Sequence, residues 1–426
     1  MNPGAWLLDS FHVAVSAADP AQIVPRHLPD PTEFSGGRIF VVGAGKASAA
    51  MALAVEKNWP ENAPLDGIVV TRYGHGLPTR RIKIIEAGHP VPDQNGMQAA
   101  QEILKQVKRL NEQDLLLCLF SGGGSSLLSL PLDGITLSDL QELTQQLLGC
   151  GANIQEINTV RKHISCLQGG RLAAACKAPV RALIISDVTG DDPTHIASGP
   201  CAPDPTYFSD ASAVLEHYHL KLPENLRSIL AAGISQQLDE TPKPGSAIFK
   251  RVENVIIASA HQSLVAAKKY FRNMNIDTLI LGDTVTGEAR EVAKVYAALI
   301  KEIRRYPGML KPPIALLSGG ETTVTLHGNG RGGRNSEFLL SLLIELNGLD
   351  NIYALACDTD GIDGSEDNAG AIIMPDSLKR GSNMGFHAEK FLDNNNAYGF
   401  FKALGDLVTT GPTYTNVNDY RVILIL

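Results

Sequence analysis

Four kinds of sequence pattern are absent from this 426-residue chain, and each absence excludes a class of protein. No apolar run approaches the ~20 residues needed to cross a bilayer, so no membrane anchor is expected. The six cysteines have neither CxxC nor Cys/His spacing, which argues against a zinc site and favours a reduced, cytoplasmic protein. With a formal net charge of -8 and no long basic patch, nucleic acid is not an expected partner. The first 20 residues lack a basic start and indicate an amphipathic helix rather than a signal peptide.

The length and the order of the segments indicate an α/β protein with two domains. A chain of 426 residues exceeds what one hydrophobic core usually organises. From Arg38 onward, strand patterns alternate with helix patterns, which is typical of a parallel sheet covered by helices. A weakly patterned region with several prolines, residues 202–245, separates two such series. We therefore predict an N-terminal domain at residues 1–240 and a second α/β domain at residues 241–426.

The expected elements follow from hydrophobic periodicity and from glycines and prolines, which mark turns and the ends of elements. Strands are predicted at residues 38–42, 67–71, 82–86, 115–120, 180–186, 255–258, 278–281, 314–317, 322–326, 353–357 and 370–374. Helices are predicted at residues 94–110, 137–148, 154–172, 262–274 and 288–305, and after the loop at 328–334.

The first strand pattern ends in a glycine turn that carries a lysine. Gly43 and Gly45 begin the GxGxxG spacing of a dinucleotide fingerprint, but Ser48 occupies the third glycine position, so NAD binding has little support. A helix is expected to begin near Lys46, where the helix dipole disfavours a cation. A lysine at such a position indicates a function, and the alternative is a solvated lysine that reaches away from the helix end.

A continuous apolar run, Leu115–Phe120, predicts a strand that is buried on both faces and ends in a Gly/Ser loop. The loop consists of Ser121, Gly122, Gly123, Gly124, Ser125 and Ser126. Ligands of α/β sheets gather at the carboxyl ends of strands, where N–H and hydroxyl groups suit phosphate. The loop lacks the GxxxxGK[ST] spacing of a Walker A loop. A tight turn of small residues is the alternative.

Acidic residues follow the strand pattern at 180–186. Asp187, Asp191 and Asp192 repel one another unless a cation or hydrogen-bond donors neutralise them. Mg²⁺ is the natural candidate, because it binds one or two carboxylates together with phosphates and waters. The alternative is an acidic turn in which Asp192 caps a helix.

The helix pattern at 154–172 carries Arg161, Lys162 and His163 in succession. Consecutive residues on a helix point in different directions, so at most one or two of them can face a common site. We expect Lys162 and His163 to be structural.

The stretch 316–338 combines a glycine-rich loop, two arginines and the start of an apolar helix. Glycines expose backbone N–H groups to a bound anion, and helix N-termini commonly bind anions. We therefore expect the loop around Arg331 and Arg334 to hold a negative group; the alternative is a mobile turn whose arginines are solvated. Two sheets that face each other across a cleft would bring this loop and the other strand-end loops together, and that cleft is the expected site.

Several motifs follow one another from about Gly43 to Gly364: VGAGKAS, SGGGSSLL, ISDVTGDD with IASGP, SGGETTVTL with GNGRGGRNSEF, and DTDGIDG. In this order they resemble the glycerate 2-kinases whose C-terminal part is the MOFRL domain. The resemblance implies ATP-dependent phosphorylation of D-glycerate to 2-phosphoglycerate with Mg²⁺. It also implies a larger Rossmann-like parallel-sheet N-terminal domain and a smaller C-terminal MOFRL domain, with the active site in the cleft between them. Members of this family often carry the label hydroxypyruvate reductase, so an NAD(P)H-dependent reductase is the alternative.

The resemblance also suggests roles for individual residues. It implies that Lys46 and Arg334 are catalytic, and we expect them to neutralise the transferred phosphoryl group or the glycerate carboxylate. Ser121, Gly122, Gly123, Gly124, Ser125 and Ser126 would bind phosphate or carboxylate oxygens, Asp187 and Asp192 would hold Mg²⁺, and Glu321, Arg331, Asn335, Asp358 and Asp360 would complete the wall of the site. A non-catalytic sensor of sugar acids or nucleotides is a third class. The sequence does not fix the oligomeric state and is compatible with a homodimer.

Overall fold

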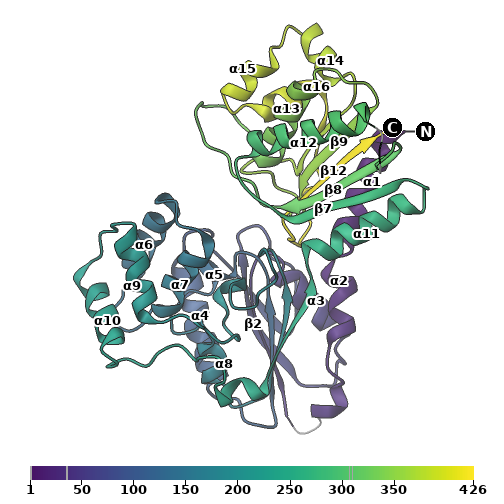
Figure 1. Cartoon of the computed structure of the whole chain (residues 1–426). Coiled ribbons are helices and arrows are strands. Elements are labelled where there is room, and N and C mark those ends of the chain that lie inside the picture. Colours follow the sequence, from purple (N-terminus) through teal and green to yellow (C-terminus); the bar gives the residue numbers. More distant parts are fainter. Residues whose placement is uncertain (1, 35–36, 307, 309) are drawn as a thin grey trace. The chain divides into compact units, whose positions relative to one another are not determined.

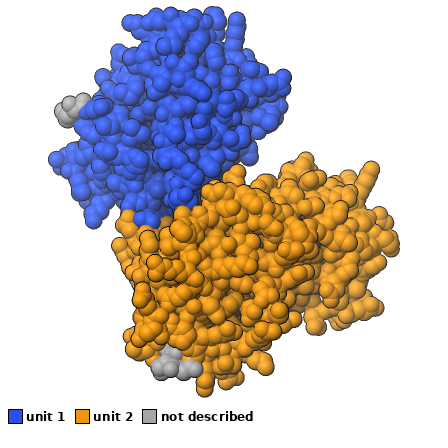
Figure 2. Space-filling view, turned by 180° about the vertical axis from the view of Figure 1, so that it is seen from behind, with its two compact units in different colours: residues 1–19, 258–426 blue, residues 20–257 orange. Residues whose placement is uncertain are grey.

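The computed structural model describes residues 2–34, 37–306, 308 and 310–426 (Figure 1). It contains two compact units, residues 20–257 and residues 1–19 with 258–426 (Figure 2). The division predicted at residues 240 and 241 differs from these units at the N-terminal end, where residues 1–19 join the second unit, and at the boundary, which lies between residues 257 and 258. Helix α1 (Pro3–Ser16) belongs to the second unit, where Leu7 and Phe11 are buried in one cluster with Leu264 and Phe271. Such a contact joins segments more than 250 positions apart in the numbering, so local patterns do not reveal it.

A six-stranded sheet forms the centre of the unit at residues 20–257. Its strands are β1 (Ile39–Ala44), β2 (Leu65–Arg72), β3 (Ile82–Ala87), β4 (Leu115–Phe120), β5 (Val180–Ile185) and β6 (Val252–Ala258). The spatial order is β3-β2-β1-β4-β5-β6, and parallel registers join β3 to β2, β2 to β1, β1 to β4 and β4 to β5. The order therefore reverses between β1 and β4, as in dinucleotide-binding sheets.

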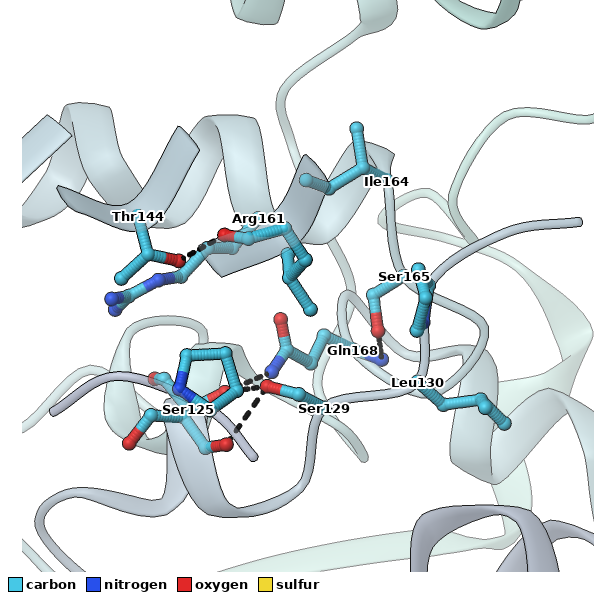
Figure 3. A pocket seen from close by; sticks show the side chains of 12 residues that line it. Ser125, Ser129, Leu130, Thr144, Arg161, Ile164, Ser165 and Gln168 are labelled. Atoms are coloured by element: carbon cyan, nitrogen blue, oxygen red, sulfur yellow. Dashed lines mark hydrogen bonds between the residues drawn. The ribbon is translucent and has the colours of Figure 1, made fainter. Parts of the chain in front are cut away.

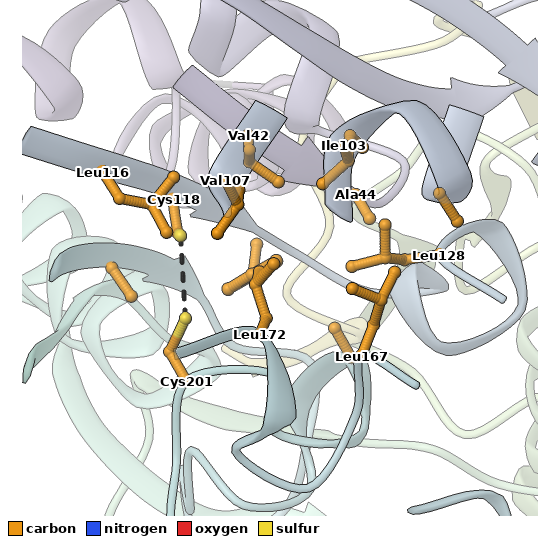
Figure 4. Packing of buried hydrophobic residues seen from close by; sticks show 14 of the residues in the cluster. Val42, Ala44, Ile103, Val107, Leu116, Cys118, Leu128, Leu167, Leu172 and Cys201 are labelled. Atoms are coloured by element: carbon orange, nitrogen blue, oxygen red, sulfur yellow. Dashed lines mark hydrogen bonds between the residues drawn. The ribbon is translucent and has the colours of Figure 1, made fainter. Parts of the chain in front are cut away.

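The two central strands are buried along their whole length, which explains their continuous apolar sequences. Helix α3 (Ser48–Asn58) contacts β1, β2 and β4, while α4 (Gln94–Val107) and α8 (Arg171–Ala175) contribute to the cluster shown in Figure 4. In that cluster Val42 and Leu116 of the sheet pack with Ile103, Val107 and Leu172. The residues that follow β1 and β4 are thereby fixed to a rigid base.

A separate helical layer packs in the same unit around its own apolar cluster. It consists of α6 (Leu137–Gly149), α7 (Ile154–His163), α9 (Phe208–His217) and α10 (Glu224–Ile234). The single helix predicted at 154–172 is wrong, because α7 ends at His163. Beyond it, the Ser165 hydroxyl accepts hydrogen bonds from the N–H groups of Leu167 and Gln168, both at 3.2 Å. Side-chain capping of this kind competes with a continuing helix.

The second unit contains a mixed sheet with the order β11-β10-β9-β12-β8-β7. The strands are β7 (Asp277–Val285), β8 (Ile314–Gly320), β9 (Ile352–Asp358), β10 (Gly370–Ile373), β11 (Leu407–Val408) and β12 (Asp419–Ile425). Only the β7–β8 pair is parallel among the pairs in the described residues. Strand β12 was not predicted from the sequence, although it lies between β9 and β8.

Helices cover both faces of this mixed sheet (Figure 1). Helix α1 and α11 (Ala260–Arg272) pack on one face. On the other face lie α12 (Ala289–Arg305), α13 (Arg334–Leu346), α15 (Ala388–Asp393) and α16 (Ala397–Leu404). The strand predicted at 322–326 is absent, because this segment forms a loop in which Thr323 and Thr325 donate hydrogen bonds to Glu288.

Short elements complete the described chain. They are α2 (Pro20–Ile23), α5 (Gly124–Leu127), α14 (Ser377–Asn383) and the 3-10 segments Val24–His27, Pro31–Phe34, Ile196–Ser198 and Ala247–Arg251. Within the described residues, no helix combines the length and the apolar character that crossing a membrane requires.

Candidate functional site

The loops that follow β1 and β4 are joined to each other by hydrogen bonds at the point where the strand order reverses. The backbone N–H of Lys46 donates to the carbonyl of Gly122 at 2.9 Å. The N–H of Ala47 donates to the Ser121 hydroxyl at 3.0 Å. The Lys46 turn and the Gly/Ser loop therefore form one continuous structure at the carboxyl edge of the sheet, where open α/β sheets bind ligands.

Two glycines of this structure are required by their surroundings. Gly45 has φ +139°, and a Cβ there would lie 2.1 Å from the Ser121 hydroxyl oxygen. Gly123 has φ +82°, and a Cβ there would lie 2.9 Å from the His89 ring. Gly45 therefore allows the close approach of the Lys46 turn to the Gly/Ser loop, and Gly123 allows the close approach of the His89 ring.

Lys46 itself lies in the turn rather than in the first turn of the helix. Helix α3 begins at Ser48, with Ala47 at its N-cap, and Lys46 is partly exposed. The expected helix start near Lys46 is therefore corrected by two residues. What singles out Lys46 is its position at the switch point of the sheet.

The acidic loop after β5 follows another strand of the same sheet, next to β4. Asp187 is partly exposed and Asp192 is exposed, and Asp192 Oδ1 accepts a hydrogen bond from the N–H of Thr194 at 2.9 Å. In the described part of the chain, no group of three or more Asp, Glu, His or Cys side chains has the arrangement of a metal site. A site with two carboxylates would need phosphates and waters as its other ligands, so Mg²⁺ at Asp187 and Asp192 stays a prediction.

The segment after this acidic loop returns to the Gly/Ser loop. The Ser198 hydroxyl oxygen lies 2.8 Å from that of Ser125 and 3.0 Å from Asn158 Oδ1. Ala197 and Ser198 both have positive φ, +51° and +58°. Sequence reasoning missed Asn158 and Ser198, because the contact depends on how α7, α5 and the 3-10 segment at 196–198 meet.

Lys162 and His163 lie in a buried polar cluster with Asp204. Lys162 Nζ lies 3.4 Å from Asp204 Oδ1, and His163 Nε2 lies 3.8 Å from Asp204 Oδ2. All three side chains are almost completely buried, so the cluster holds α7 to the segment that precedes α9. This arrangement supports their expected structural role.

A second cluster lies inside the other unit and surrounds Arg334, the first residue of α13. Its guanidinium is 2.8 Å from carboxylate oxygens of both Asp419 and Asp358, and 3.2 Å from Glu321. Asp358 and Asp419 are paired on β9 and β12. Burial alone would lower the pKa of Arg334, but the three carboxylates outweigh it and hold the pKa well above its ordinary value. Arg334 is thus a cation whose charge is already balanced by its own unit.

Three other residues belong to this cluster. Asn335 Nδ2 donates to Asp419 Oδ1 at 2.7 Å, and the N–H of Asp360 donates to Asp358 Oδ1 at 3.0 Å. Arg421 donates to Asp419 and, at 3.2 Å, to the carbonyl of Gly319. Asp419 and Arg421 were missed from the sequence because their strand, β12, was not predicted.

The glycine-rich loop at 328–334 differs from its expected role as an open anion cradle. Its N–H groups donate to internal acceptors: Gly328 to Asn395 Oδ1 at 3.0 Å, Asn329 to Asn394 Oδ1 at 3.1 Å and Arg331 to Asn396 Oδ1 at 3.2 Å. These asparagines connect α15 to α16, so the loop is fixed to the edge of the helical layer. Its glycines serve this close packing; a Cβ on Gly330 would lie 2.3 Å from the carbonyl of Asn394.

Arg331 and the N-terminus of α13 are also engaged within the unit. Arg331 forms an ion pair with Glu366 and lies over the Tyr398 ring, 4.6 Å from its centroid. The N–H groups of Asn335 and Ser336 donate to the carboxylate of Asp363, each at 2.9 Å. The anion expected at this helix start is therefore a buried side chain of the protein itself.

The structure thus brings together two separate groups of the predicted residues. Lys46 and residues 121–126 meet at the switch point of one sheet, and Glu321, Arg334, Asn335, Asp358 and Asp360 meet around the ends of β9 and β12 in the other unit. Arg331 instead forms its ion pair with Glu366. A shared cleft stays a prediction, as does the catalytic role of these residues.

Comparisons with known proteins match this chain to two family models and to relatives that cover nearly its full length. A family model described as a domain of unknown function, DUF4147, matches residues 6–231, and the MOFRL family model matches residues 314–419. The chain is 50% identical over 418 residues to a putative hydroxypyruvate reductase of Agrobacterium vitis, with 97% of this chain and 93% of the relative covered. It is 40% identical to a glycerate 2-kinase of Pyrococcus horikoshii, over 97% and 95% of the two chains. The crystal structure of a glycerate kinase from Thermotoga maritima superposes with a TM-score of 0.88 at 39% identity and covers 99% of both chains.

Proposed function

The chain belongs to the glycerate kinase family, and we propose that its own reaction is the transfer of a phosphoryl group from a nucleotide to the 2-hydroxyl of glycerate. The observation that carries this proposal is the joined pair of loops at the strand-order reversal, with Lys46 on one loop and glycines and serines on the other. Kinase names belong to relatives that match this chain over nearly its full length.

In this proposal ATP is the phosphoryl donor, and the loops after β1 and β4 bind its phosphates. The Lys46 ammonium group neutralises charge on the transferred phosphoryl group, which is the main requirement of phosphoryl transfer. The hydroxyl and N–H groups of residues 121–126 orient phosphate oxygens beside it.

Asp187 and Asp192 are the proposed ligands of Mg²⁺. Their oxygen atoms are the donor type that Mg²⁺ prefers, neither carboxylate is fully buried, and both follow a strand next to the Gly/Ser loop. Mg²⁺ bound there would neutralise phosphate charge during transfer.

Arg334 is proposed to act with its carboxylates rather than as an isolated cation. An anion can reach its guanidinium by replacing one of the three acidic partners. Glu321 is the most exposed of them, with 58% of its side chain accessible, against 6% for Asp358 and 0% for Asp419. Exchange of Glu321 for a substrate oxyanion is therefore the least costly route for Arg334 to bind a ligand.

A reductase is the second candidate, because a relative with 50% identity is named a putative hydroxypyruvate reductase and the strand order is that of dinucleotide-binding sheets. At the third position of the glycine fingerprint, however, the buried Ser48 donates a hydrogen bond to the carbonyl of Leu119 at 2.9 Å. The side chain thus occupies space that a third glycine would leave open.

An assay of both reactions tests the proposal. Purified protein is given D-glycerate, ATP and Mg²⁺ in one reaction, and hydroxypyruvate with NADH or NADPH in another. We expect phosphorylation only, and Lys46→Ala should reduce kcat by about 10²- to 10³-fold, the usual cost of removing one stabilising group from a transition state. Lys57→Ala, which removes an exposed lysine from the last turn of α3, is the control and should leave kcat unchanged.

Oxidation of NAD(P)H without a phosphorylated product would overturn the kinase proposal in favour of the reductase. Full kinase activity in Lys46→Ala would remove Lys46 from the catalytic group and leave the reaction itself intact.

A further inference from the structure

Arg161 differs from the two basic residues that follow it on α7. Lys162 and His163 face the buried carboxylate of Asp204. The Arg161 side chain forms no hydrogen bond or ion pair with any residue in the described part of the chain. Because Arg161 lies in the last turn of the helix, the dipole favours its charge there, but no side chain among the described residues neutralises it.

The Arg161 side chain contributes to the wall of a small pocket (Figure 3). In this view it lies across from Ser125 and Ser129, with Gln168 between them and Ser165 to one side. The pocket has a volume of about 10 Å³, about the space of one water molecule, so only a terminal group of a ligand can enter it. Ser125 and Ser126 belong to the Gly/Ser loop, so the pocket is continuous with the loops at the switch point.

The pocket also has hydroxyl groups in its lining, and the Ser165 side chain lies at the opposite end of the view from the Arg161 guanidinium (Figure 3). The Ser165 oxygen accepts two backbone N–H groups, and its own proton is not used by any described residue. The hydroxyls of Ser129 and Thr144 instead donate to main-chain carbonyls, at 2.9 Å to Ser126 and 2.7 Å to Leu140. The Ser125 hydroxyl accepts a hydrogen bond from Ser198, so the donors open to a ligand include the Arg161 N–H groups and the hydroxyls of Ser125 and Ser165.

Gln168 adds a hydrogen-bond acceptor. Its Nε2 donates to the carbonyls of Ser125 at 2.7 Å and Leu128 at 3.4 Å, which fixes the orientation of the amide. Its Oε1 receives no hydrogen bond from the described residues and is available to a hydroxyl group of a ligand. A cation and an amide oxygen in the lining of one pocket match a carboxylic acid that carries a hydroxyl group.

The electrostatics favour an anionic occupant. Burial lowers the pKa of Arg161 to about 10, because no nearby carboxylate of the described chain offsets the loss of water. The side chain nevertheless stays charged at neutral pH, and a charged group in such surroundings gains from an ionic partner. A carboxylate can accept two parallel N–H bonds from a guanidinium.

We propose that the pocket at Arg161 binds the carboxylate of the hydroxy-acid substrate, with Gln168 Oε1 accepting a hydroxyl of the same molecule. The proposal rests on the proposed kinase function, and it assigns substrate recognition to Arg161, which neither the glycine motifs nor the acidic motifs contain. Inorganic phosphate also presents oxyanions to a guanidinium and is therefore the competing ligand in the test.

Equilibrium binding to the full chain tests this assignment independently of turnover. D-glycerate, inorganic phosphate and ATP are titrated separately by calorimetry into the wild type, Arg161→Met, Arg161→Lys and the control Arg109→Met, which removes an exposed arginine of the same unit. Loss of a charge-assisted bidentate contact should weaken D-glycerate binding by about 10- to 100-fold in Arg161→Met, with ATP binding unchanged. Arg161→Lys keeps the charge without the planar fork and should fall between the wild type and Arg161→Met.

Three results would overturn the assignment. They are unchanged D-glycerate affinity in both Arg161 variants, a selective loss of phosphate or ATP affinity, and no D-glycerate binding by the wild type. If Arg161→Met does not fold, the Arg161→Lys comparison decides. If the wild type binds D-glycerate through Arg161 but does not phosphorylate it, the pocket proposal stands and the proposed kinase function fails.

Discussion

Gly45 shows how a single residue determines the geometry of the candidate site. Its φ of +139° and the 2.1 Å that would separate an added Cβ from the Ser121 hydroxyl oxygen exclude any side chain. Gly45→Ala should therefore lower the free energy of unfolding by at least about 3 kcal/mol, because backbone strain and a steric clash add together. Urea-induced unfolding measures this change.

Gly245→Ala provides the matched comparison for this prediction. Gly245 also has positive φ, +86°, but no atom lies within 4 Å of the added Cβ position. Gly245→Ala should lower the free energy of unfolding only through backbone strain, by about 1 kcal/mol. Equal losses in the two variants would contradict the steric argument.

The lowered pKa of His163 predicts that the free energy of unfolding depends on pH. Burial lowers its pKa, against the raising effects of the Thr159 carbonyl and the charges of Asp204 and Glu240. Below the unfolded pKa of about 6.5, the unfolded chain binds a proton that the folded chain does not, so the free energy of unfolding falls as the pH falls. His195 also has a lowered pKa, caused first by burial, and adds to the same trend.

Unfolding at a series of pH values between about 5 and 8 measures this dependence. His163→Gln should show a smaller decrease below a pH of about 6.5 than the wild type, whereas replacement of the exposed His217 by Gln should leave the decrease unchanged. The same decrease in His163→Gln and the wild type would contradict the assignment.

At the residue scale, the sequence was sufficient to predict local turns and loops, but not which side chains form ion pairs with each other. The turn at Lys46 and the loop at 121–126 were identified from glycines after apolar runs, since such loops are encoded locally. Whether Arg161 or Lys162 has a carboxylate partner depends on Asp204, about forty positions away in the sequence. Residue types alone could not decide which of the adjacent cations is neutralised.

At the scale of elements, the start of α13 depends on a buried carboxylate. Asp363 accepts the N–H groups of Asn335 and Ser336 and the Ser336 hydroxyl, and its side chain is fully buried. In Asp363→Asn, an NH₂ group replaces one of the two carboxylate oxygens that accept these hydrogen bonds. The NH₂ group can only donate, so it faces N–H groups that then lack an acceptor. We expect a loss of about 2–3 kcal/mol in the free energy of unfolding, because buried N–H groups are left unpaired.

Asp93→Asn is the contrasting change for this prediction. Asp93 caps the partly exposed start of α4 through the N–H of Gly96, at 3.0 Å. Asparagine is an equally good N-cap, so a loss below about 1 kcal/mol is expected. Comparable losses at both helices, measured by urea unfolding, would show that burial of Asp363 has no special effect.

The elements that the sequence predicted correctly are those with strong local patterns. The run at 115–120 is β4 without any shift of its ends, and the helix predicted at 137–148 is α6 with one further residue. The strand at 322–326 was wrong because β-branched residues there bond to Glu288 through their hydroxyls and backbone. Tertiary contacts overrode local propensity at that point.

At the scale of the whole molecule, strand order carries the functional argument but cannot be obtained from local patterns. Alternating strands and helices indicated a parallel sheet, and the reversal between β1 and β4 became visible only in the structure. The second unit differs more from the expected parallel sheet, because its sheet is mixed and includes the last strand of the described chain, β12. Pairing between segments distant in sequence is decided by the whole fold.

The most direct test of the central claim is the identity of the phosphorylated product. Full-length protein is incubated with D-glycerate, ATP and Mg²⁺, and the product is examined by phosphorus NMR with proton coupling. Phosphorylation at the 2-hydroxyl predicts a signal coupled to the single proton on carbon 2. A signal coupled to the two protons on carbon 3, or no phosphorylated product while hydroxypyruvate is reduced with NAD(P)H, would contradict assignment of this chain as a glycerate 2-kinase.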